Sequence, residues 1–399
     1  MNYLIEKLFK IALKPERKII GLMSGTSLDG LDIALCSCSG SGSSLKIKVL
    51  KFKTVAYDTK FREEIKSIFS RRDADIQQVC ILNELIGIRH GEMILDALQE
   101  WKIVPEMIDL IASHGQTIYH APKLQHKIEN YPNATLQIGD GDHIAVKTGI
   151  ITLSDFRQKH IAAGGEGAPL AVYGDYLMFS NKDEDRVMLN IGGISNFTYL
   201  PASGTHKKIL STDVGPGNTL MDQFIQQIQP GSFFDKDAQL ALSGTVNIRL
   251  LKSLSNHGFF KSNFPKTTGP ELFNLEYLNN ALLISETANL SNKDIMATLC
   301  RFTANEIISA IERCCEIKHH VKIYLSGGGM HNPLLLKYLK AGLQDATFKT
   351  TLDLGIHPDA KEAVLFAVLA NETVAGSSAD FGGSKEVPSI GMGKISLPK

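Results

Sequence analysis

Apolar positions in the first half of the chain alternate between the two-residue period of strands and the longer period of helices. The pattern from 61 to 101 has helical periodicity. We expect strands over 18–23, 45–56, 108–113 and 135–138, and a further strand that begins at 31. The first two strands form a hairpin, and several of the others end in polar turns. Because α/β folds bind ligands at strand ends, these turns are candidate sites.

The second half of the chain repeats this arrangement. We expect strands over 187–190, 197–200, 209–212 and 321–325, and helices over 334–343 and 360–370, the last with Asp359 as its N-cap. A hairpin with a glycine turn therefore occurs in both halves, as expected when two domains clamp a nucleotide between them. We predict one domain over 1–150 and a second over 151–375, with the tail 376–399 packing back on the first.

Residues 1–20 have apolar side chains at helical spacing, interrupted by Glu6, Lys7 and Lys10. Such a segment could be an organellar leader or a membrane-surface helix. Its apolar runs are too short for a signal sequence, no small-residue cleavage site follows, and a strand starts at once. We therefore predict a helix packed on the domain. No stretch approaches about 18 uninterrupted apolar residues, so we expect no membrane span.

Composition narrows the class of partner. The 399 residues are too many for one compact core of the usual size and favour two domains. Lys plus Arg and Asp plus Glu both number 42, so no net charge favours nucleic acid or an anionic membrane, and a small-molecule partner fits better. The six cysteines include no C-x-x-C pair, which indicates free thiols in the cytoplasm and no disulfide or metal role.

The turn at 24–30 combines the features of a phosphate-binding loop. Gly25 and Gly30 permit positive φ and close backbone approach, the hydroxyls beside them can donate hydrogen bonds, and successive N–H groups form an anion-binding nest. Asp29 adds a carboxylate that could face Mg²⁺. The alternative is an ordinary Asp-Gly hairpin turn. The residues predicted to bind the nucleotide here are Ser24, Gly25, Thr26, Ser27, Leu28, Asp29, Gly30 and Leu31.

Two later turns extend this pattern. No G-x-x-x-x-G-K-[ST] sequence occurs and no G-x-G-x-x-G opens a helix after a strand, which argues against P-loop and Rossmann chemistry. A second hairpin turn and a triple glycine are instead spaced for a second phosphate contact and a loop under an adenosine. The residues concerned are Gly192, Gly193, Asn196, Gly327, Gly328, Gly329 and Asn332. The ordered set is typical of the sugar-kinase, actin and heat-shock ATPase superfamily.

A series of short motifs follows in order from about 21 to about 375: GLMSGTSLDGLDIAL, SHGQTIYH, TLQIGD, SDFR, AAGG-x-GAPL, NIGGISN, DVGPGNTLMD, DKDA, PKTTG and SGGG-x-x-NP. The series resembles the anhydro-N-acetylmuramic acid kinase family. The resemblance implies an actin-like, ribonuclease H-like α/β fold of two domains, with mixed sheets and a cleft between the domains. It also implies a reaction dependent on ATP and Mg²⁺, in which water opens the 1,6-anhydro ring of anhydro-N-acetylmuramic acid. The γ-phosphoryl group moves to the sugar 6-oxygen, giving N-acetylmuramic acid 6-phosphate in bacterial cell-wall recycling.

Two acidic residues match catalytic groups of that family. Water that attacks an anomeric carbon needs a carboxylate base, because the transition state is oxocarbenium-like and the water must lose a proton. Asp213 matches this base; its alternative role is to cap the helix that includes 220–227. Glu362 matches a family acid near the sugar and the attacking water. Alone, it would be interpreted as a surface residue favoured by the helix dipole.

Several further residues could contact the sugar substrate. Arg157 could bind the lactyl carboxylate or a phosphate through two hydrogen bonds, or it could form a structural pair with Asp155. A His that follows a buried strand is more often structural than a sugar contact. A Lys in a rigid turn could meet sugar or phosphate, or remain a solvated loop residue. The residues predicted to bind the substrate are His114, Gln116, Arg157, Gly215, Asn218 and Lys266.

The chain departs from the family pattern at three places. His160 replaces an Asp, Glu166 replaces a Gln, and Ala171-Val172 replaces Val-Pro. The first two flank the expected sugar pocket, so the substrate could be a different anhydrosugar, as in the similar levoglucosan kinases, or activity could be reduced. An actin-like ATP-binding switch that phosphorylates no sugar is a second alternative, although such a switch has no use for the sugar-pocket motifs. The sequence also leaves a homodimer open.

Overall fold

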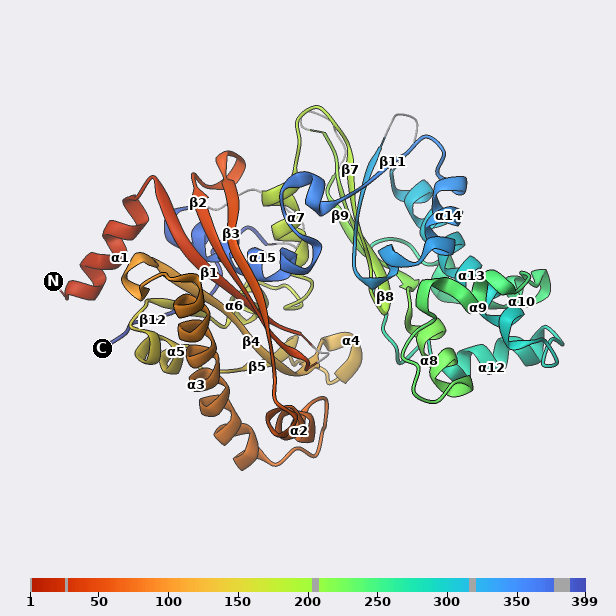
Figure 1. The fold of residues 1–399 in the computed structure, drawn as a ribbon, viewed down its shortest axis with the longest axis horizontal. Helices are drawn as coiled ribbons and strands as arrows, with labels where there is room; N and C mark the ends of the chain where they lie inside the picture. Colours follow the sequence, from red (N-terminus) through yellow and green to blue (C-terminus); the bar gives the residue numbers. More distant parts are fainter. Residues whose placement is uncertain (1, 26–27, 203–207, 316–320, 377–387) are drawn as a thin grey trace. The chain divides into compact units, whose positions relative to one another are not determined.

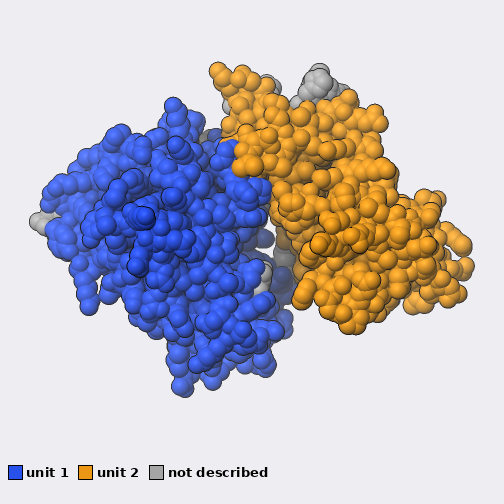
Figure 2. All heavy atoms as spheres, viewed as in Figure 1, with its two compact units in different colours: residues 1–178, 355–399 blue, residues 179–354 orange. Residues whose placement is uncertain are grey.

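The computed structural model describes residues 2–25, 28–202, 208–315, 321–376 and 388–399. The chain forms two compact units (Figure 2). Unit 1 comprises Met1–Met178 and Gly355–Lys399, and unit 2 comprises Phe179–Leu354.

Unit 1 is built on a mixed sheet in the order β12-β6-β4-β1-β2-β3, with β5 paired to β4 (Figure 1). Strands β1, β2 and β3 form an antiparallel meander, β4 runs parallel to β1 on its other side, and β6 runs parallel to β4. The elements of this unit are α1 (Tyr3–Leu13), β1 (Glu16–Ser24), β2 (Gly30–Ser39), η1 (Gly42–Ser44), β3 (Lys46–Ala56), α2 (Thr59–Ile68), α3 (Ile76–Trp101), η2 (Pro105–Met107), β4 (Leu110–Ala121), α4 (Lys123–His126), β5 (Ala134–Ile138), α5 (Gly141–Thr148), β6 (Thr152–Ser154), α6 (Phe156–Ala162), α7 (Ala171–Phe179), η6 (Pro358–Ala360), α15 (Lys361–Ala375) and β12 (Lys394–Ser396).

Unit 2 has a five-stranded sheet in the order β11-β10-β7-β8-β9. Strands β7, β8 and β9 form an antiparallel meander, and β10 and β11 continue the sheet in parallel on the other side of β7. The elements are β7 (Arg186–Ile191), β8 (Ile194–Leu200), β9 (Leu210–Pro216), α8 (Thr219–Ile228), η3 (Lys236–Ala238), α9 (Gln239–Ser243), α10 (Ile248–Ser255), α11 (Gly258–Lys261), α12 (Leu275–Ile284), α13 (Asn292–Cys315), β10 (Lys322–Ser326), η4 (Gly328–His331), α14 (Pro333–Gly342), β11 (Thr347–Thr350) and η5 (Thr351–Leu354).

The two sheets share one topology. In each unit a three-stranded meander is followed by two parallel strands that add on the far side of its first strand. A glycine turn joins the first two strands of both meanders, as the sequence pattern predicts. This duplicated arrangement is that of the ribonuclease H-like units of actin-like ATPases, and it confirms the predicted α/β fold of two domains with mixed sheets.

The units divide the chain at residues other than those predicted. The first unit extends to Met178 rather than to 150, because β6 pairs with β4 and lengthens its sheet. The segment 355–375 also belongs to unit 1, where α15 packs on β1. A Cβ on Gly21 would lie 1.9 Å from the carbonyl oxygen of Ala363, so this close approach requires glycine. The pairing of β12 with β6 places the end of the chain on the same sheet.

Each sheet has one face that packs into a helical core. In unit 1, alternate residues of β1 and β2, among them Ile20 and Ile33, join side chains of α2, α3 and α5. In unit 2, Val187, Leu189 and Ile191 of β7 point into the core formed with α8, α10, α12, α13 and α14. The intervening residues of β7 therefore point to the opposite face.

Two predicted elements have different limits in the structure. The helical periodicity from 61 to 101 is divided, since α2 ends at Ile68 and α3 begins at Ile76 after the N-cap Asp75. Strand β4 continues beyond 113 to Ala121, because β5 pairs with its second half. His114 and Gln116 therefore lie within a strand and not in a turn that follows it.

The N-terminal end of α15 also differs from the prediction. Its N-cap is Ala360, and Asp359 lies in the short helical turn η6. The backbone N–H of Asp359 donates to His357 Nδ1 at 3.3 Å, so His357 caps that turn. The prediction of Asp359 as N-cap is wrong.

Helix α1 packs on the domain, as predicted. Leu4 and Ile11 are buried and the helix contacts α15, whereas Tyr3, Phe9 and Leu13 are exposed. In the part of the chain that the structure describes, no helix combines the length and apolarity needed to cross a membrane.

Candidate active site

The first glycine turn, between β1 and β2, is held at both ends through its carbonyl oxygens. Nε2 of Gln116 donates to the carbonyl oxygen of Gly25 at 3.2 Å. The backbone N–H of Tyr57 donates to the carbonyl oxygen of Asp29 at 3.0 Å. Because C=O and N–H of one trans peptide point in opposite directions, this anchoring keeps carbonyl oxygens away from a bound anion.

Ser24 does not present its hydroxyl to a ligand. Its side chain is 1% exposed, and Oγ donates to Gln116 Oε1 at 2.5 Å and lies 2.8 Å from the Tyr57 hydroxyl. Ser24 and Gln116 therefore form part of the support beneath the turn, which is a different role from the nucleotide and sugar contacts predicted for them.

Most of the other predicted residues of this turn could meet a ligand only through their backbone, and two of them lie outside the described residues. Leu28 and Leu31 have buried side chains, so only their backbone groups could meet a phosphate. A Cβ on Gly30 would lie 2.4 Å from a backbone oxygen of β3, which explains the glycine there. The predicted Thr26 and Ser27 lie outside the described residues.

His114 and Arg157 form a hydrogen-bonded pair in unit 1. Arg157 donates from Nε to His114 Nε2 at 2.8 Å and from Nη1 to the carbonyl oxygen of Gly167 at 2.7 Å. Burial and the Arg157 charge hold the pKa of His114 well below its usual range, so the ring is neutral and can accept. Burial lowers the pKa of Arg157 to about 10, against the opposing charge of Glu362. These contacts use Nε and Nη1 and leave Nη2 for an anionic ligand.

The structural role predicted as an alternative for Arg157 is wrong, whereas the one predicted as an alternative for His114 agrees with its contacts. Asp155 forms an ion pair with Lys394 at 2.5 Å, so a structural Arg157–Asp155 pair is wrong. His114 is 2% exposed, and its ring centroid lies 4.9 Å from that of Phe366. The structure therefore gives His114 the task of orienting Arg157, which is the structural alternative.

Asp32 is an acidic residue near the predicted site that sequence reasoning missed. It is half-buried on β2, and the Thr54 hydroxyl donates to it at 2.5 Å. Burial raises its pKa, and the charges of Asp29, Glu362 and Asp359 raise it further. Asp29 and Glu362, predicted for metal and sugar, thus lie near a common carboxylate, although Glu362 itself is exposed. The sequence signal that could have identified Asp32 is an acidic residue between apolar residues of a buried strand.

His160, one of the departures from the family pattern, shapes a loop. The side chain is fully buried, and Nδ1 accepts from the backbone N–H of Gly167 at 2.9 Å. A Cβ on Gly165 would lie 2.2 Å from His160 Cε1, so the ring fills the space beside that glycine. Glu166 lies in the same loop. His160 therefore acts on the backbone that supplies the Gly167 carbonyl to Arg157.

Four polar side chains lie in one row across the sheet of unit 2. Asp213 on β9 is opposite Asn196 on β8, and Asn190 on β7 lies between Asn196 and Ser326 on β10. Paired residues point to the same face of a sheet. Ser326 Oγ donates to Asn190 Oδ1 at 3.3 Å, which agrees with this register. The row thus runs from the predicted base to the residue before Gly327, and Asn190 and Ser326 were not predicted.

A β-bulge aims Asp213 into this row. The pairing of β8 with β9 changes from Ser195 opposite Gly215 to Asn196 opposite Asp213, so Val214 is an extra residue on β9. Without this bulge, Asp213 would pair with the next residue along β8. Because successive strand residues alternate between the two faces of a sheet, its side chain would then point to the core side.

Asp213 is held by the loop that carries the PKTTG motif. Its backbone N–H donates to the carbonyl oxygen of Lys266 at 2.9 Å, and its Oδ2 accepts from the backbone N–H of Thr268 at 2.9 Å. Burial raises its pKa to about 6, the Thr268 hydrogen bond opposes this, and the charge of Glu271 adds to it. The helix-capping alternative is wrong, since Asn218 occupies the N-cap of α8. Oδ1 remains to act on a ligand.

The side chain of Lys266 is occupied within unit 2. Nζ donates to the carbonyl oxygen of Phe259 at 2.9 Å and lies 4.2 Å from the Phe259 ring centroid and 4.8 Å from that of Phe264. Burial lowers its pKa, and the charge of Arg313 lowers it further. Lys266 is therefore neither a solvated loop residue nor aimed at a sugar, and its part in the site is the backbone carbonyl that holds Asp213.

The second glycine turn is fastened to the start of α8. The N–H groups of Gly217 and Thr219 donate to the carbonyl oxygen of Gly193 at 2.8 and 3.1 Å, and that of Asn218 donates to Gly192 at 2.8 Å. Because the carbonyl oxygen of Gly192 faces α8, the N–H of Gly193 in the same peptide points away from α8 and is available to a ligand. A Cβ on Gly217 would lie 2.2 Å from the Gly192 oxygen.

The third turn packs directly against β7. Gly327 has a φ of 80°, and a Cβ there would lie 2.7 Å from Asn190 Oδ1. A Cβ on Gly329 would lie 2.3 Å from Ile191 Cγ2. Asn218 Nδ2 donates to the carbonyl oxygen of Ile191 at 3.3 Å. Asn218 therefore contacts the second turn through its backbone and the strand beneath the third turn through its side chain.

Three more predicted residues have clear structural surroundings. Asn332 Oδ1 accepts from the backbone N–H of Leu335 at 2.9 Å, so this side chain caps α14. Gly215 has a φ of 147°, and a Cβ there would lie 2.9 Å from Phe260 Cε1. Gly328 has only ordinary contact distances around a Cβ position. Of the three, Gly328 has the backbone most open to a ligand.

Comparison with known proteins decides the family. The family model of anhydro-N-acetylmuramic acid kinase matches residues 17–393. The chain belongs to the anhydro-N-acetylmuramic acid kinase family. It is 52% identical over 400 residues to an anhydro-N-acetylmuramic acid kinase of Pseudoalteromonas atlantica, with 100% of both chains covered. It is also 50% identical to one from Pseudoalteromonas translucida, with 98% of each covered, and 38% identical to one from Caldanaerobacter subterraneus subsp. tengcongensis, with 98% and 100% covered.

Membership of the anhydro-N-acetylmuramic acid kinase family confirms the resemblance seen in the motifs. Proteins of this family are phosphotransferases that act on an alcohol group, and a kinase family implies ATP as phosphoryl donor. The match covers the turns, Asp213, Glu362 and Arg157 described above.

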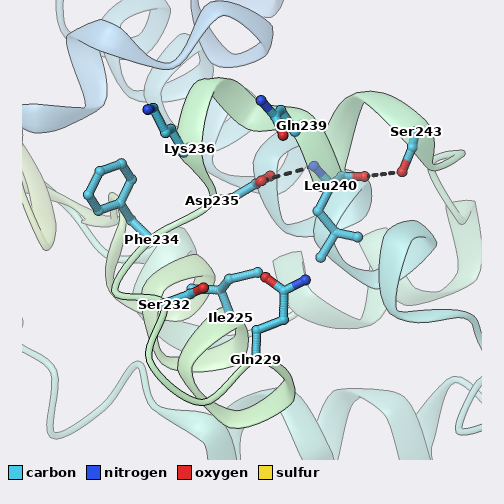
Figure 3. A pocket seen from close by; sticks show the side chains of 9 residues that line it. All are labelled: Ile225, Gln229, Ser232, Phe234, Asp235, Lys236, Gln239, Leu240 and Ser243. Atoms are coloured by element: carbon cyan, nitrogen blue, oxygen red, sulfur yellow. Dashed lines mark hydrogen bonds between the residues drawn. The ribbon is translucent and has the colours of Figure 1, made fainter.

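Unit 2 also has a cavity that none of the predicted site residues lines. Its volume is about 420 Å³, and all of its lining comes from 225–243 (Figure 3). Asp235, which lines it, accepts from the backbone N–H groups of Leu240 and Ala241 in α9 at 2.9 Å each. The lining residues are Ile225, Gln229, Ser232, Phe234, Asp235, Lys236, Gln239, Leu240 and Ser243.

Proposed function

We propose that the protein is an ATP-dependent anhydro-N-acetylmuramic acid kinase that forms N-acetylmuramic acid 6-phosphate. The observation that carries this proposal is the setting of Asp213, a half-buried carboxylate with a pKa near 6 that is fixed through Oδ2 and keeps Oδ1 for a ligand. The family supports the choice of sugar over levoglucosan. All six cysteines lie in the described residues and none forms a disulfide, which together with the use of ATP favours the cytoplasm. The homodimer stays a prediction.

Asp213 is assigned as the base for the attacking water. Water must lose a proton as its bond to C1 forms, because the transition state is oxocarbenium-like. A carboxylate with a pKa raised to about 6 is mostly ionised at neutral pH and accepts that proton more readily than an ordinary Asp. The bond from C1 to the 6-oxygen breaks, and this oxygen takes the γ-phosphoryl group. Phosphorylation thereby replaces the general acid of an ordinary glycosidase.

The glycine turns are assigned to the nucleotide, the first two to its phosphates and the third to its adenosine. Anchored carbonyls in the first two turns support this assignment. Mg²⁺ carried by ATP would neutralise charge on the transferred group. Among the described residues no group of three His, Cys, Asp or Glu side chains could hold a metal alone. Nucleotide-bound Mg²⁺ takes only one or two carboxylates, since phosphate and water oxygens complete its shell, and we assign Asp29 to it.

Arg157 is assigned to the lactyl carboxylate of the sugar. Its orientation is fixed by His114 and the Gly167 carbonyl, and the remaining Nη2 can donate to a carboxylate oxygen. Glu362 is close enough for its charge to raise the pKa of Arg157, which supports its place near the sugar.

Activity should fall as pH drops through about 6, because only ionised Asp213 can accept the proton. The charge of Glu271 contributes to the raised pKa, so Glu271→Gln should favour the ionised form and move this acid limb to lower pH. Glu276→Gln, an exposed change on the nearby α12, serves as the control and should leave the limb in place. Profiles of kcat/KM against pH that coincide for wild type and Glu271→Gln would contradict the assignment.

The substrate assignment is tested by a panel of sugars. We expect rapid ATP-dependent formation of a sugar 6-phosphate from anhydro-N-acetylmuramic acid and little from levoglucosan, which lacks the carboxylate assigned to Arg157. Mass spectrometry of the products and release of ADP are the measurements. Preferred turnover of levoglucosan would support the alternative anhydrosugar kinase. ATP hydrolysis that no sugar stimulates would support the ATP-binding switch.

A further inference from the structure

A chain of four buried polar side chains ends at the first glycine turn. His90 Nε2 lies 2.8 Å from the Tyr57 hydroxyl, which lies 2.8 Å from Ser24 Oγ, and Ser24 in turn donates to Gln116 Oε1 at 2.5 Å. Gln116 Nε2 then donates to the carbonyl oxygen of Gly25 at 3.2 Å. His90 and Gln116 are 0% exposed, Ser24 is 1% exposed and Tyr57 is 7% exposed.

The direction of every hydrogen bond in this chain follows from its last member. The Gly25 carbonyl can only accept, so Gln116 must turn its NH₂ group towards it and its Oε1 towards Ser24. Ser24 has one proton, which goes to Gln116, so it accepts from Tyr57. The Tyr57 oxygen then accepts from the Nε2–H of a His90 whose pKa burial lowers to about 3.

Stability alone does not account for this chain. Four apolar side chains would fill the same space without the cost of burying polar groups. The chain of hydrogen bonds also ends at His90, whose Nδ1 is buried and has no hydrogen-bond partner among the residues that the structure describes. Tyr57 has a second contact with the turn, since its backbone N–H donates to the carbonyl oxygen of Asp29 at 3.0 Å. One residue thus supports both ends of the turn.

We propose that Tyr57 is a positioning residue for the phosphate-binding turn, acting on Gly25 through Ser24 and Gln116 and on Asp29 through its own backbone. This inference rests on the proposed binding of ATP phosphates at that turn. The Tyr57 hydroxyl donates to Ser24 and leaves the single Ser24 proton for Gln116 Oε1, which holds the amide where its NH₂ group reaches the Gly25 carbonyl. Without the hydroxyl, Ser24 loses the donor that holds it, and the Gln116 amide that anchors Gly25 loses part of its support, so the turn is held less firmly.

Tyr57→Phe tests this inference, with Tyr277→Phe as the matched control. The Tyr277 hydroxyl donates to the carbonyl oxygen of Leu254 in unit 2, so each variant removes one tyrosine hydroxyl that donates a hydrogen bond, and Tyr57→Phe also removes the acceptor of the His90 bond. For Tyr57→Phe we expect the KM for ATP and the Kd for ADP to rise about tenfold while the KM for the sugar changes less than about twofold. Tyr277→Phe should leave all three values unchanged.

Gln116→Glu provides a second test that does not depend on Tyr57. It keeps an acceptor for Ser24 but removes the donor to Gly25, so ADP affinity should again fall about tenfold. Wild-type ADP affinity in both Tyr57→Phe and Gln116→Glu would overturn the inference, as would an equal loss in Tyr277→Phe. ADP binding by calorimetry needs no sugar, so failure of the sugar reaction in the wild type would refute the proposed function separately.

Discussion

Asp213→Asn should lower the rate of sugar phosphorylation by about 10²–10⁴-fold, the usual contribution of a general base. The amide is nearly isosteric with the carboxylate, and its oxygen can still accept from the Thr268 N–H seen at 2.9 Å. It cannot accept a proton from water at any pH used for assay. ADP affinity should therefore stay close to the wild-type value while turnover is lost.

Asp222→Asn is the matched control for this prediction. Burial raises the pKa of Asp222 to about 6 as well, but this residue lies in the first turn of α8 and outside the polar row of unit 2. Its variant should keep turnover within about tenfold of the wild-type rate. Steady-state kinetics with saturating ATP compare the two. An Asp213→Asn enzyme within tenfold of wild type would mean that another group activates the water.

Gly217→Ala should produce the second large effect, on nucleotide binding. The new Cβ would lie 2.2 Å from the carbonyl oxygen of Gly192 and 2.8 Å from Ser195 Oγ, so the second turn must move away from α8. That movement breaks the bonds from the N–H groups of 217–219 and reorients the Gly193 N–H, which we propose donates to a phosphate. We expect at least a tenfold weaker ADP affinity and a loss of about 1–3 kcal/mol in the free energy of unfolding.

Gly258→Ala is the control for Gly217→Ala, because its added Cβ would have no neighbour within 4 Å. Calorimetry of ADP binding and thermal unfolding should separate the two variants, with Gly258→Ala unchanged in affinity. If Gly217→Ala binds ADP as the wild type does, the second turn is not a phosphate site.

The fold could be predicted well from local patterns. The strands of both meanders and the glycine turns that join them followed from apolar alternation and from glycine placement. Two boundaries differ from the predictions because they depend on contacts with segments distant in sequence. Strand β4 extends past 113 because β5 pairs with it. Residues 355–375 belong to unit 1 because α15 packs against β1 at Gly21. Neither partner is visible in the local sequence.

The candidate site was only partly predictable for the same reason. The glycine motifs stood out because their chemistry is local, and Asp213 stood out because it matches the catalytic base of the family. Asn190 and Asp32 did not, because the place of Asn190 in the row with Asp213 depends on strand register, and that of Asp32 near Glu362 depends on helix packing. Ser24, Gln116, Lys266 and Asn332 carry polar groups suited to ligands, but the fold uses their side chains internally.

Phosphorylation of anhydro-N-acetylmuramic acid in water enriched in a heavy oxygen isotope tests the central claim most directly. The protein is incubated with ATP, Mg²⁺ and the sugar, and the product is fragmented in a mass spectrometer. Water activated by Asp213 attacks C1, so the account predicts N-acetylmuramic acid 6-phosphate with the label at the anomeric oxygen and none in the phosphate. The spectrum is taken before the anomeric oxygen exchanges with solvent, against a control of unlabelled product added to labelled water. A 6-phosphate whose anomeric oxygen carries no more label than that control would contradict the account.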